Sequence, residues 1–134
     1  MDTKIKHQTY NSADYKSLTE KERTVFRQVV DNLDERGLFS TADIPVIAGY
    51  ARNVVLARTA AKDIEKLGTV IKFLDRGCEK YKTNPAVDIM NKAQMAYQDT
   101  AIKLGLTPTG AKRLKGEGKP KKSALEAFDE EFEQ

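Results

Sequence analysis

The sequence has no tryptophan, one cysteine and one histidine among its 134 residues, and only 7% of it is aromatic. The single cysteine, Cys78, excludes an internal disulfide and a metal site built from several thiolates. We expect it to be a small buried strand residue. The single histidine, His7, stands in a polar N-terminal stretch, so no scaffold could orient it as a catalytic base.

Long apolar runs are also missing from the sequence. The longest nearly apolar stretch, residues 44–51, contains Pro45 and Gly49 and is far shorter than the roughly 20 residues that span a bilayer. Residues 1–20 carry scattered charges and no apolar segment, so we expect no secretory leader. These absences predict a protein with no membrane partner that stays in the cytoplasm where it is made.

The sites of common enzymes are incomplete. Residues 116–119, Gly-Glu-Gly-Lys, match part of a phosphate-binding loop, but Arg113 occupies the place of an earlier glycine and Pro120 that of the following Ser or Thr. Carboxylates such as Asp31 and Asp34 fall at solvent-facing positions of a helical pattern, where a metal site is uncommon. We predict no catalytic residue, no metal site and no cofactor, and hence a protein that is not an enzyme.

What the sequence does contain is a helical pattern in one domain with short tails. Thr19 and Glu22 form a capping box that begins a first helix, and Gly37 is placed to end it. Residues 1–17 show no apolar period and are predicted to be a flexible N-terminal arm. The apolar residues of the first helix recur at helical spacing and predict one buried face: Val25, Phe26, Val29, Val30 and Leu33.

A longer second helix is predicted from Ser40 or Thr41 to Gly68, with an apolar face that extends to Leu67. The short link between the two helices makes them antiparallel neighbours. Small residues on the second helix and on a third would let other helices approach closely, which predicts an obligate oligomer. These residues are Ala57, Ala60, Ala61, Ala93 and Ala96.

Residues 69–74 are β-branched and aromatic, residues 75–77 have turn chemistry and residues 78–82 could pair back, which predicts a small β-hairpin. Because a lone hairpin is marginal in water, it must lie on the helices or join hairpins from other subunits. Asn84-Pro85 begins a third helix, and Gly105 ends it. The predicted fold class is therefore mainly α: an antiparallel helical hairpin, a third helix and a small β-hairpin.

Charge is distributed unevenly after residue 111. Gly116, Gly118 and Pro120 cannot build a stable helix interior, so residues 115–122 are predicted to be a basic flexible linker. From charge alone, a solvated linker and a phosphate-binding segment both remain open. Residues 112–122 contain one carboxylate and six cations: Lys112, Arg113, Lys115, Lys119, Lys121 and Lys122.

Residues 123–134 form an acidic tail with five carboxylates and no cation. Ser123 and Glu126 make a capping box, and Leu125, Phe128 and Phe132 fall on one helical face. A helix of about ten residues is marginal alone, so the tail is predicted to be disordered in the free protein and to fold when its apolar stripe enters a groove. A purely solubilising tail is the alternative.

Motifs in residues 84–87 (Asn-Pro-Ala-Val), 91–93 (Asn-Lys-Ala) and 104–109 (Leu-Gly-Leu-Thr-Pro-Thr), followed by Arg113-Leu114, occur in a familiar order. Over roughly residues 17–114 the chain resembles the small terminase subunit of tailed bacteriophages. The resemblance implies a homo-oligomeric ring that binds double-stranded viral DNA in the host cytoplasm. It also implies that the ring hands the DNA to the large terminase subunit, which holds the ATPase and the nuclease.

With this resemblance, residues 18–114 are expected to form the helical core for oligomerisation and DNA binding. DNA binding is expected to be mostly electrostatic and carried partly by the six cations of residues 112–122, with Arg52, Arg58 and Lys62 on the second helix as alternative contacts. The resemblance makes the large subunit the partner of the tail, which would dock through Leu125, Phe128 and Phe132.

Two other functions are weighed against this one. The first two helices could form the helix-turn-helix of a small transcriptional regulator, since the turn at Gly37 allows it. The length of the second helix argues against this, because a recognition helix is usually shorter. A metal-dependent nuclease is disfavoured by the missing cluster of ligands.

Overall fold

The computed structural model describes residues 1–108 and residue 110. In this part of the chain the fold is mainly helical, with one small antiparallel sheet. The elements are α1 (Thr3–Tyr10), α2 (Ala13–Lys16), α3 (Glu20–Glu35), the 3₁₀ turn η1 (Thr41–Asp43), α4 (Ile44–Leu67), β1 (Val70–Asp75), β2 (Cys78–Thr83) and α5 (Pro85–Leu104).

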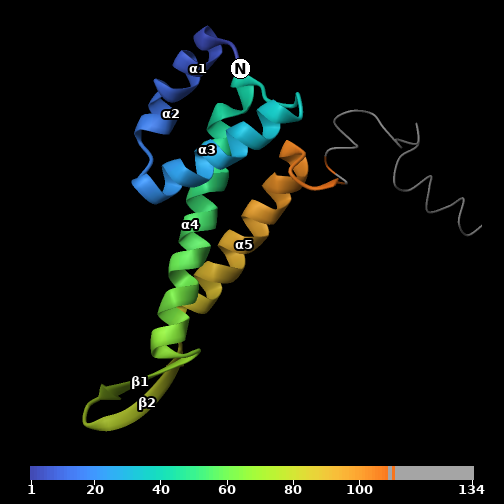
Figure 1. Ribbon diagram of the computed structural model, residues 1–134. Helices are drawn as coiled ribbons and strands as arrows, with labels where there is room; N and C mark the ends of the chain where they lie inside the picture. Colours follow the sequence, from blue (N-terminus) through green and yellow to red (C-terminus); the bar gives the residue numbers. More distant parts are fainter. Residues whose placement is uncertain (109, 111–134) are drawn as a thin grey trace, which may run out of the picture.

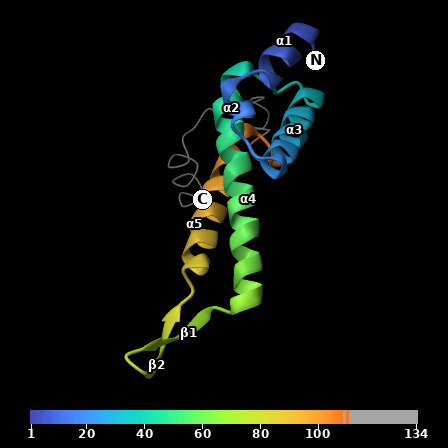
Figure 2. The same cartoon turned by 90° about the vertical axis from the view of Figure 1, so that its left-hand side faces the viewer.

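The long helix α4 organises the molecule (Figure 1). The helices α1, α2 and α3 gather around its first half, and α5 runs back along its other side. The hairpin β1–β2 joins α4 to α5 and projects beyond the ends of both helices, as the view turned by 90° also shows (Figure 2). The predicted mainly α class with a small β-hairpin is confirmed, and α1 and α2 are two helices that the prediction did not include.

Helix α3 begins and ends as its sequence predicts. The Glu22 amide donates to the Thr19 hydroxyl at 3.4 Å, and the Thr19 amide donates to the Glu22 carboxylate at 2.9 Å, which completes the capping box. Gly37 has φ of 68° just after the helix, and the Leu38 amide donates to the Leu33 carbonyl at 2.8 Å. This left-handed residue closes α3 and turns the chain toward α4.

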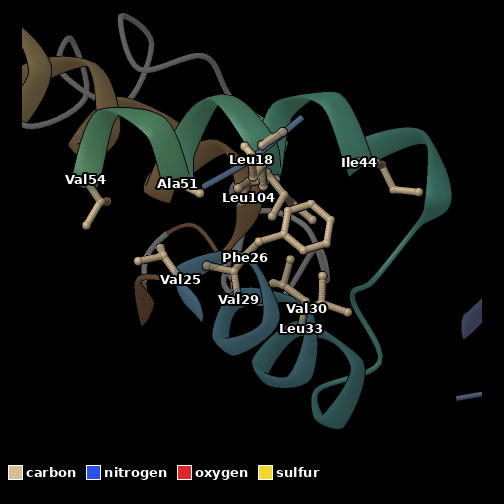
Figure 3. Packing of buried hydrophobic residues seen from close by; sticks show 12 residues of the cluster. Leu18, Val25, Phe26, Val29, Val30, Leu33, Ile44, Ala51, Val54 and Leu104 are labelled. Atoms are coloured by element: carbon tan, nitrogen blue, oxygen red, sulfur yellow. The ribbon is translucent and has the colours of Figure 1, made fainter. Parts of the chain in front are cut away.

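The core lies between α3 and the first half of α4. Phe26, Val30 and Leu33 are fully buried on α3, where they face Ile44 and Ala51 of α4 (Figure 3). The predicted apolar face of the first helix is confirmed. The predicted face of the second helix is too long, because burial on α4 ends at Ala60 and Leu67 is 61% exposed.

The prediction of a flexible arm in residues 1–17 is wrong. Tyr10 and Tyr15 pack edge to face with ring centroids 5.0 Å apart, and the Tyr15 ring lies 5.1 Å from that of Phe26. Arg27 donates to the Tyr15 hydroxyl at 2.8 Å, and Thr9 is fully buried. Two tyrosines therefore attach α1 and α2 to the core. They do not recur at helical spacing, so the absence of a periodic apolar face did not reveal this attachment.

The β-hairpin has the predicted strands, and its turn places Arg76 at φ 53° and Gly77 at φ 79°. Positive φ at both central residues fits a turn whose twist matches that of the strands. The hairpin does not lie on the helices of this chain, since every residue of β2 is exposed. Cys78 is therefore exposed, and the expectation that it is buried is wrong.

Asn84 connects the hairpin to α5 and is only 3% exposed. Its side-chain carbonyl accepts from the Ala86 amide at 3.0 Å, which caps α5 as predicted. Its side-chain amide also donates to the Gly68 carbonyl at 2.9 Å, so one residue fixes the start of α5 against the end of α4.

A candidate anion-binding groove between α3 and α4

A groove of about 550 Å³ lies between α3 and α4, and we call it the basic groove. Each helix presents to it residues spaced at i, i+3, i+4 and i+7, which share one face of a helix. The lining residues are Lys21, Thr24, Val25 and Gln28 from α3 and Val55, Arg58, Thr59, Ala61 and Lys62 from α4.

The core fixes the distance between the two walls of the basic groove. Val25 is 6% exposed and belongs both to the hydrophobic core and to the groove lining, and Val55 packs against the same core. Figure 3 shows Val25 on α3 beside Val54 on α4, at one end of the buried cluster. The floor of the groove is therefore apolar and well packed, while its rim carries the long polar side chains.

The basic groove has a strongly positive lining. Lys21, Arg58 and Lys62 contribute three cations, and no Asp or Glu lines the groove in the described part of the chain. Within residues 1–108 and 110, none of the three cations forms an ion pair. The described residues therefore provide no counter-charge for these three cations in a salt bridge.

These groups suit the binding of a phosphate or a carboxylate. A guanidinium offers a planar set of donors that matches an oxyanion, and lysine ammonium groups act as point charges beside it. Thr24, Thr59 and Gln28 add hydroxyl and amide donors along the same walls. The lining therefore combines positive charge with hydrogen-bond donors, which suits the binding of an anion.

Arg58 also borders two smaller hollows beside the basic groove. One, of about 260 Å³, lies between α4 and α5 and includes Tyr50 and Tyr97, whose rings meet edge to face at 6.0 Å. Burial raises the pKa of Tyr50, and Tyr97 adds to this rise, while the neighbouring charge of Arg58 opposes it. The other hollow, of about 240 Å³, is lined by Val25, Arg58 and Leu106 among others.

The structure brings together two of the three helix-two cations predicted to contact DNA. Arg58 and Lys62 lie one helical turn apart in the basic groove. Arg52 does not join them, because it donates to the hydroxyl of Ser17 at 2.7 Å. The six basic residues of 112–122 and the tail residues Leu125, Phe128 and Phe132 lie outside the described residues.

Lys21 is the groove residue that sequence reasoning missed. It precedes Thr24, Val25 and Gln28 at the spacing of one helical face, so the face itself was readable from the sequence. The sequence alone does not show that this face of α3 lies across the groove from Arg58, because their relative position depends on how α3 crosses α4.

In residues 1–108 and 110, no group of three or more His, Cys, Asp or Glu side chains could hold a metal ion. None of the helices in the same residues is long and apolar enough to cross a membrane.

The family described as phage terminase, small subunit, matches the chain over residues 23–121. The match includes most of α3, all of α4, the β-hairpin and α5, and so contains eight of the nine residues that line the basic groove. No curated protein and no solved structure matches the chain.

Proposed function

The chain belongs to the phage terminase small-subunit family, and we propose that it binds double-stranded viral DNA as a homo-oligomeric ring. In this proposal the ring recruits and regulates the large terminase subunit in the host cytoplasm to initiate genome packaging. Family membership supports the packaging role. The proposal assigns this chain no catalytic step, and the ATPase and nuclease belong to the large subunit.

The observation that carries DNA binding is the basic groove. Lys21 from α3 and Arg58 and Lys62 from α4 line one groove without carboxylates in its lining, and phosphate oxygens are their natural partners. The six cations of residues 112–122 would extend the positive surface along the DNA backbone. The proposed contacts are to phosphates, which position the duplex and carry no sequence information directly.

The salt dependence of DNA binding tests this assignment. Lys21→Gln, Arg58→Gln and Lys62→Gln together, which we call the groove variant, remove three charges. Because each phosphate contact contributes about 0.9 to the slope of log affinity against log salt, the slope should become shallower by about 2 to 3 per engaged subunit.

A matched variant separates local contact from net charge. Lys4→Gln, Lys6→Gln and Lys66→Gln remove the same charge from exposed positions outside the groove lining. This control should keep the wild-type salt slope. A separate variant, with the six cations of residues 112–122 replaced by Ser, measures how much that segment contributes to the slope. An unchanged slope in the groove variant would reject the basic groove as a DNA site.

Exposed apolar residues support assembly into an oligomer. Leu67, Leu74, Tyr81 and Met95 are 61%, 73%, 66% and 72% exposed, and all four lie on the second half of α4, the hairpin or α5. Contiguous apolar surface is typical of contact sites between proteins, and in the proposed ring these elements of neighbouring copies would cover one another. Sedimentation velocity at micromolar concentration should give a closed oligomer, and a monomer under these conditions would reject the ring.

The acidic tail is the proposed contact with the large subunit. Phe128→Ala with Phe132→Ala removes most of its apolar stripe and leaves its five carboxylates in place. The double variant should lose co-elution with the large subunit while its oligomer size is unchanged. Undiminished co-elution would show that the tail is not the docking element.

A further inference from the structure

We infer that the basic groove has a second ligand, the acidic tail of this same protein, which occupies the groove when neither DNA nor the large subunit is bound. This inference rests on the proposed function in one respect, namely that the groove is a DNA site. The tail would then act as an internal competitor of DNA.

Charge complementarity is the first argument for the tail as occupant. The basic groove carries Lys21, Arg58 and Lys62 and no carboxylate, whereas residues 123–134 carry five carboxylates and no cation. The tail is therefore the segment of this chain whose charge most closely resembles that of a phosphate backbone. Carboxylates and phosphates are bound by the same ammonium and guanidinium donors.

The apolar pattern of the tail fits the groove floor. Val25, Val55 and Ala61 line the groove between its cations. In the tail, Leu125, Phe128 and Phe132 recur at i, i+3 and i+7, with carboxylates between them. An amphipathic segment that places apolar side chains on an apolar floor and charges on a rim of opposite sign gains from both contacts. A DNA backbone would use only the rim.

The chain leaves the described core close to the basic groove. Leu106 lines a hollow with Val25, Gln28 and Arg58, and these three residues also line the groove. Residues 111–122 then separate this exit from the tail. A segment of that length spans at most about 40 Å when extended, so the tail can reach the groove of its own chain. Short flexible connections give effective concentrations of about 1 mM, so weak docking is sufficient.

This arrangement would couple the two partners of the protein. When the large subunit binds the tail, the basic groove becomes free for DNA, and DNA in the groove in turn leaves the tail free for the large subunit. The two partners would therefore favour each other's binding without touching, as linkage requires.

The first experiment measures DNA affinity at fixed salt for the full-length protein with Phe128→Ala and Phe132→Ala, called the tail variant. It keeps all five carboxylates, so a gain in affinity reports loss of docking rather than loss of negative charge. With a docking constant of about 100 μM and an effective concentration of about 1 mM, DNA affinity should rise about tenfold. If the groove variant shows the shallower salt slope, so that the groove is a DNA site, wild-type affinity in the tail variant would overturn the inference, since it would show that the stripe does not compete with DNA for the groove.

The second experiment contains no DNA. A fluorescent peptide of residues 123–134 is titrated into the full-length tail variant, and its anisotropy is recorded. We expect the peptide to bind the tail variant saturably. Peptide binding should be lost when the protein also carries the groove substitutions, and it should be retained when the six cations of residues 112–122 are replaced by Ser. The opposite pattern would overturn the inference, because the tail would then pair with its own linker.

The two experiments distinguish failure of this inference from failure of the proposed function. Peptide binding that depends on the groove, combined with an unchanged salt slope for DNA in the groove variant, would keep the tail in the groove and reject the groove as a DNA site. A shallower salt slope without peptide binding would keep the DNA site and reject the tail as its competitor.

Discussion

The two ends of α4 use apolar side chains in opposite ways. At the proximal end, which comprises α1–α3 and the first half of α4, Phe26 and Leu33 are fully buried. At the distal end, which comprises the second half of α4 and the hairpin, Leu74 and Tyr81 are 73% and 66% exposed. The proximal end completes a core within one chain, whereas the distal end presents apolar surface outward.

The difference follows from what packs on each half of α4. The first half of α4 packs against α2 and α3 on one side and α5 on another, so its apolar residues are covered from several directions. The second half of α4 also packs against α5, with Ala57 and Ala61 beside Met90, whereas the hairpin beyond it has no such cover. The hairpin is held mainly by its own ladder and by ion pairs on its surface, such as Lys72–Glu79 and Lys80–Asp75, each 2.8 Å long. Exposed ion pairs stabilise little, so the hairpin has few contacts within this chain that would keep it rigid.

The largest predicted effect is at the proximal core. Phe26→Ala should lower the free energy of unfolding by about 3–5 kcal/mol, because a fully buried ring is lost and a cavity remains. Urea denaturation followed by circular dichroism measures this loss. Phe73→Ala, at a side chain 37% exposed on the hairpin, is the matched control and should cost clearly less. Equal losses would remove the contrast between the two ends.

The next effect is at Asn84, a nearly buried polar side chain that joins the hairpin to α5. Asn84→Ala should cost about 1–3 kcal/mol, because the Ala86 amide and the Gly68 carbonyl both lose their partner. Asn91→Ala, at an exposed position on the same helix, is the control and should be nearly neutral. Hydrogen exchange should show faster opening at the start of α5 in the Asn84 variant. Unchanged exchange there would mean that Asn84 does not fix the junction.

The sequence predicted those features that depend on local rules. The capping box at Thr19, the turn at Gly37 and the Asn84-Pro85 start of α5 are all confirmed, since each is set by hydrogen bonds within a few residues. The N-terminal arm was predicted wrongly because Tyr10 is attached by contacts across the fold rather than by a periodic face.

The candidate site was predictable only in part for the same reason. Arg58 and Lys62 could be predicted as DNA contacts because cations on a long helix are visible in the sequence. Arg52 was predicted with them on the same ground. That Lys21 lies opposite Arg58, while Arg52 binds Ser17, depends on the crossing of α3 over α4 and on the position of α2. No spacing within one helix encodes these contacts.

A smaller effect is predicted at high pH and only for the proximal end. Burial raises the pKa of both Tyr10 and Tyr50 from the ordinary value of 10.0, with further contributions from Asp31 and Tyr97 respectively. The folded protein therefore holds these protons more tightly than the unfolded chain. Their contribution to stability is full below pH 10 and is lost as pH rises through the folded values.

Tyr10→Phe with Tyr50→Phe should make the decline of stability above pH 10 shallower, because the double variant has neither hydroxyl to ionise. Urea unfolding at a series of alkaline pH values measures this slope. Each single variant should remove part of the decline. A double variant with the wild-type slope would show that ionisation of these two tyrosines does not loosen the proximal end.

The smallest effect on folding is predicted at the hairpin. A small effect there would distinguish the exposed distal end most clearly from the buried proximal end. Leu74→Ser with Tyr81→Ser replaces two side chains that the chain itself hardly covers, so the unfolding free energy at the lowest protein concentration should change by less than about 0.5 kcal/mol. If copies of the protein cover the distal end, the same variant should form smaller assemblies in sedimentation velocity, and its melting temperature should depend less on protein concentration. Glu79→Ser, on the same face of the hairpin, is the polar control and should assemble as wild type. Assemblies of unchanged size would mean that the apolar surface of the hairpin is not what holds the copies together.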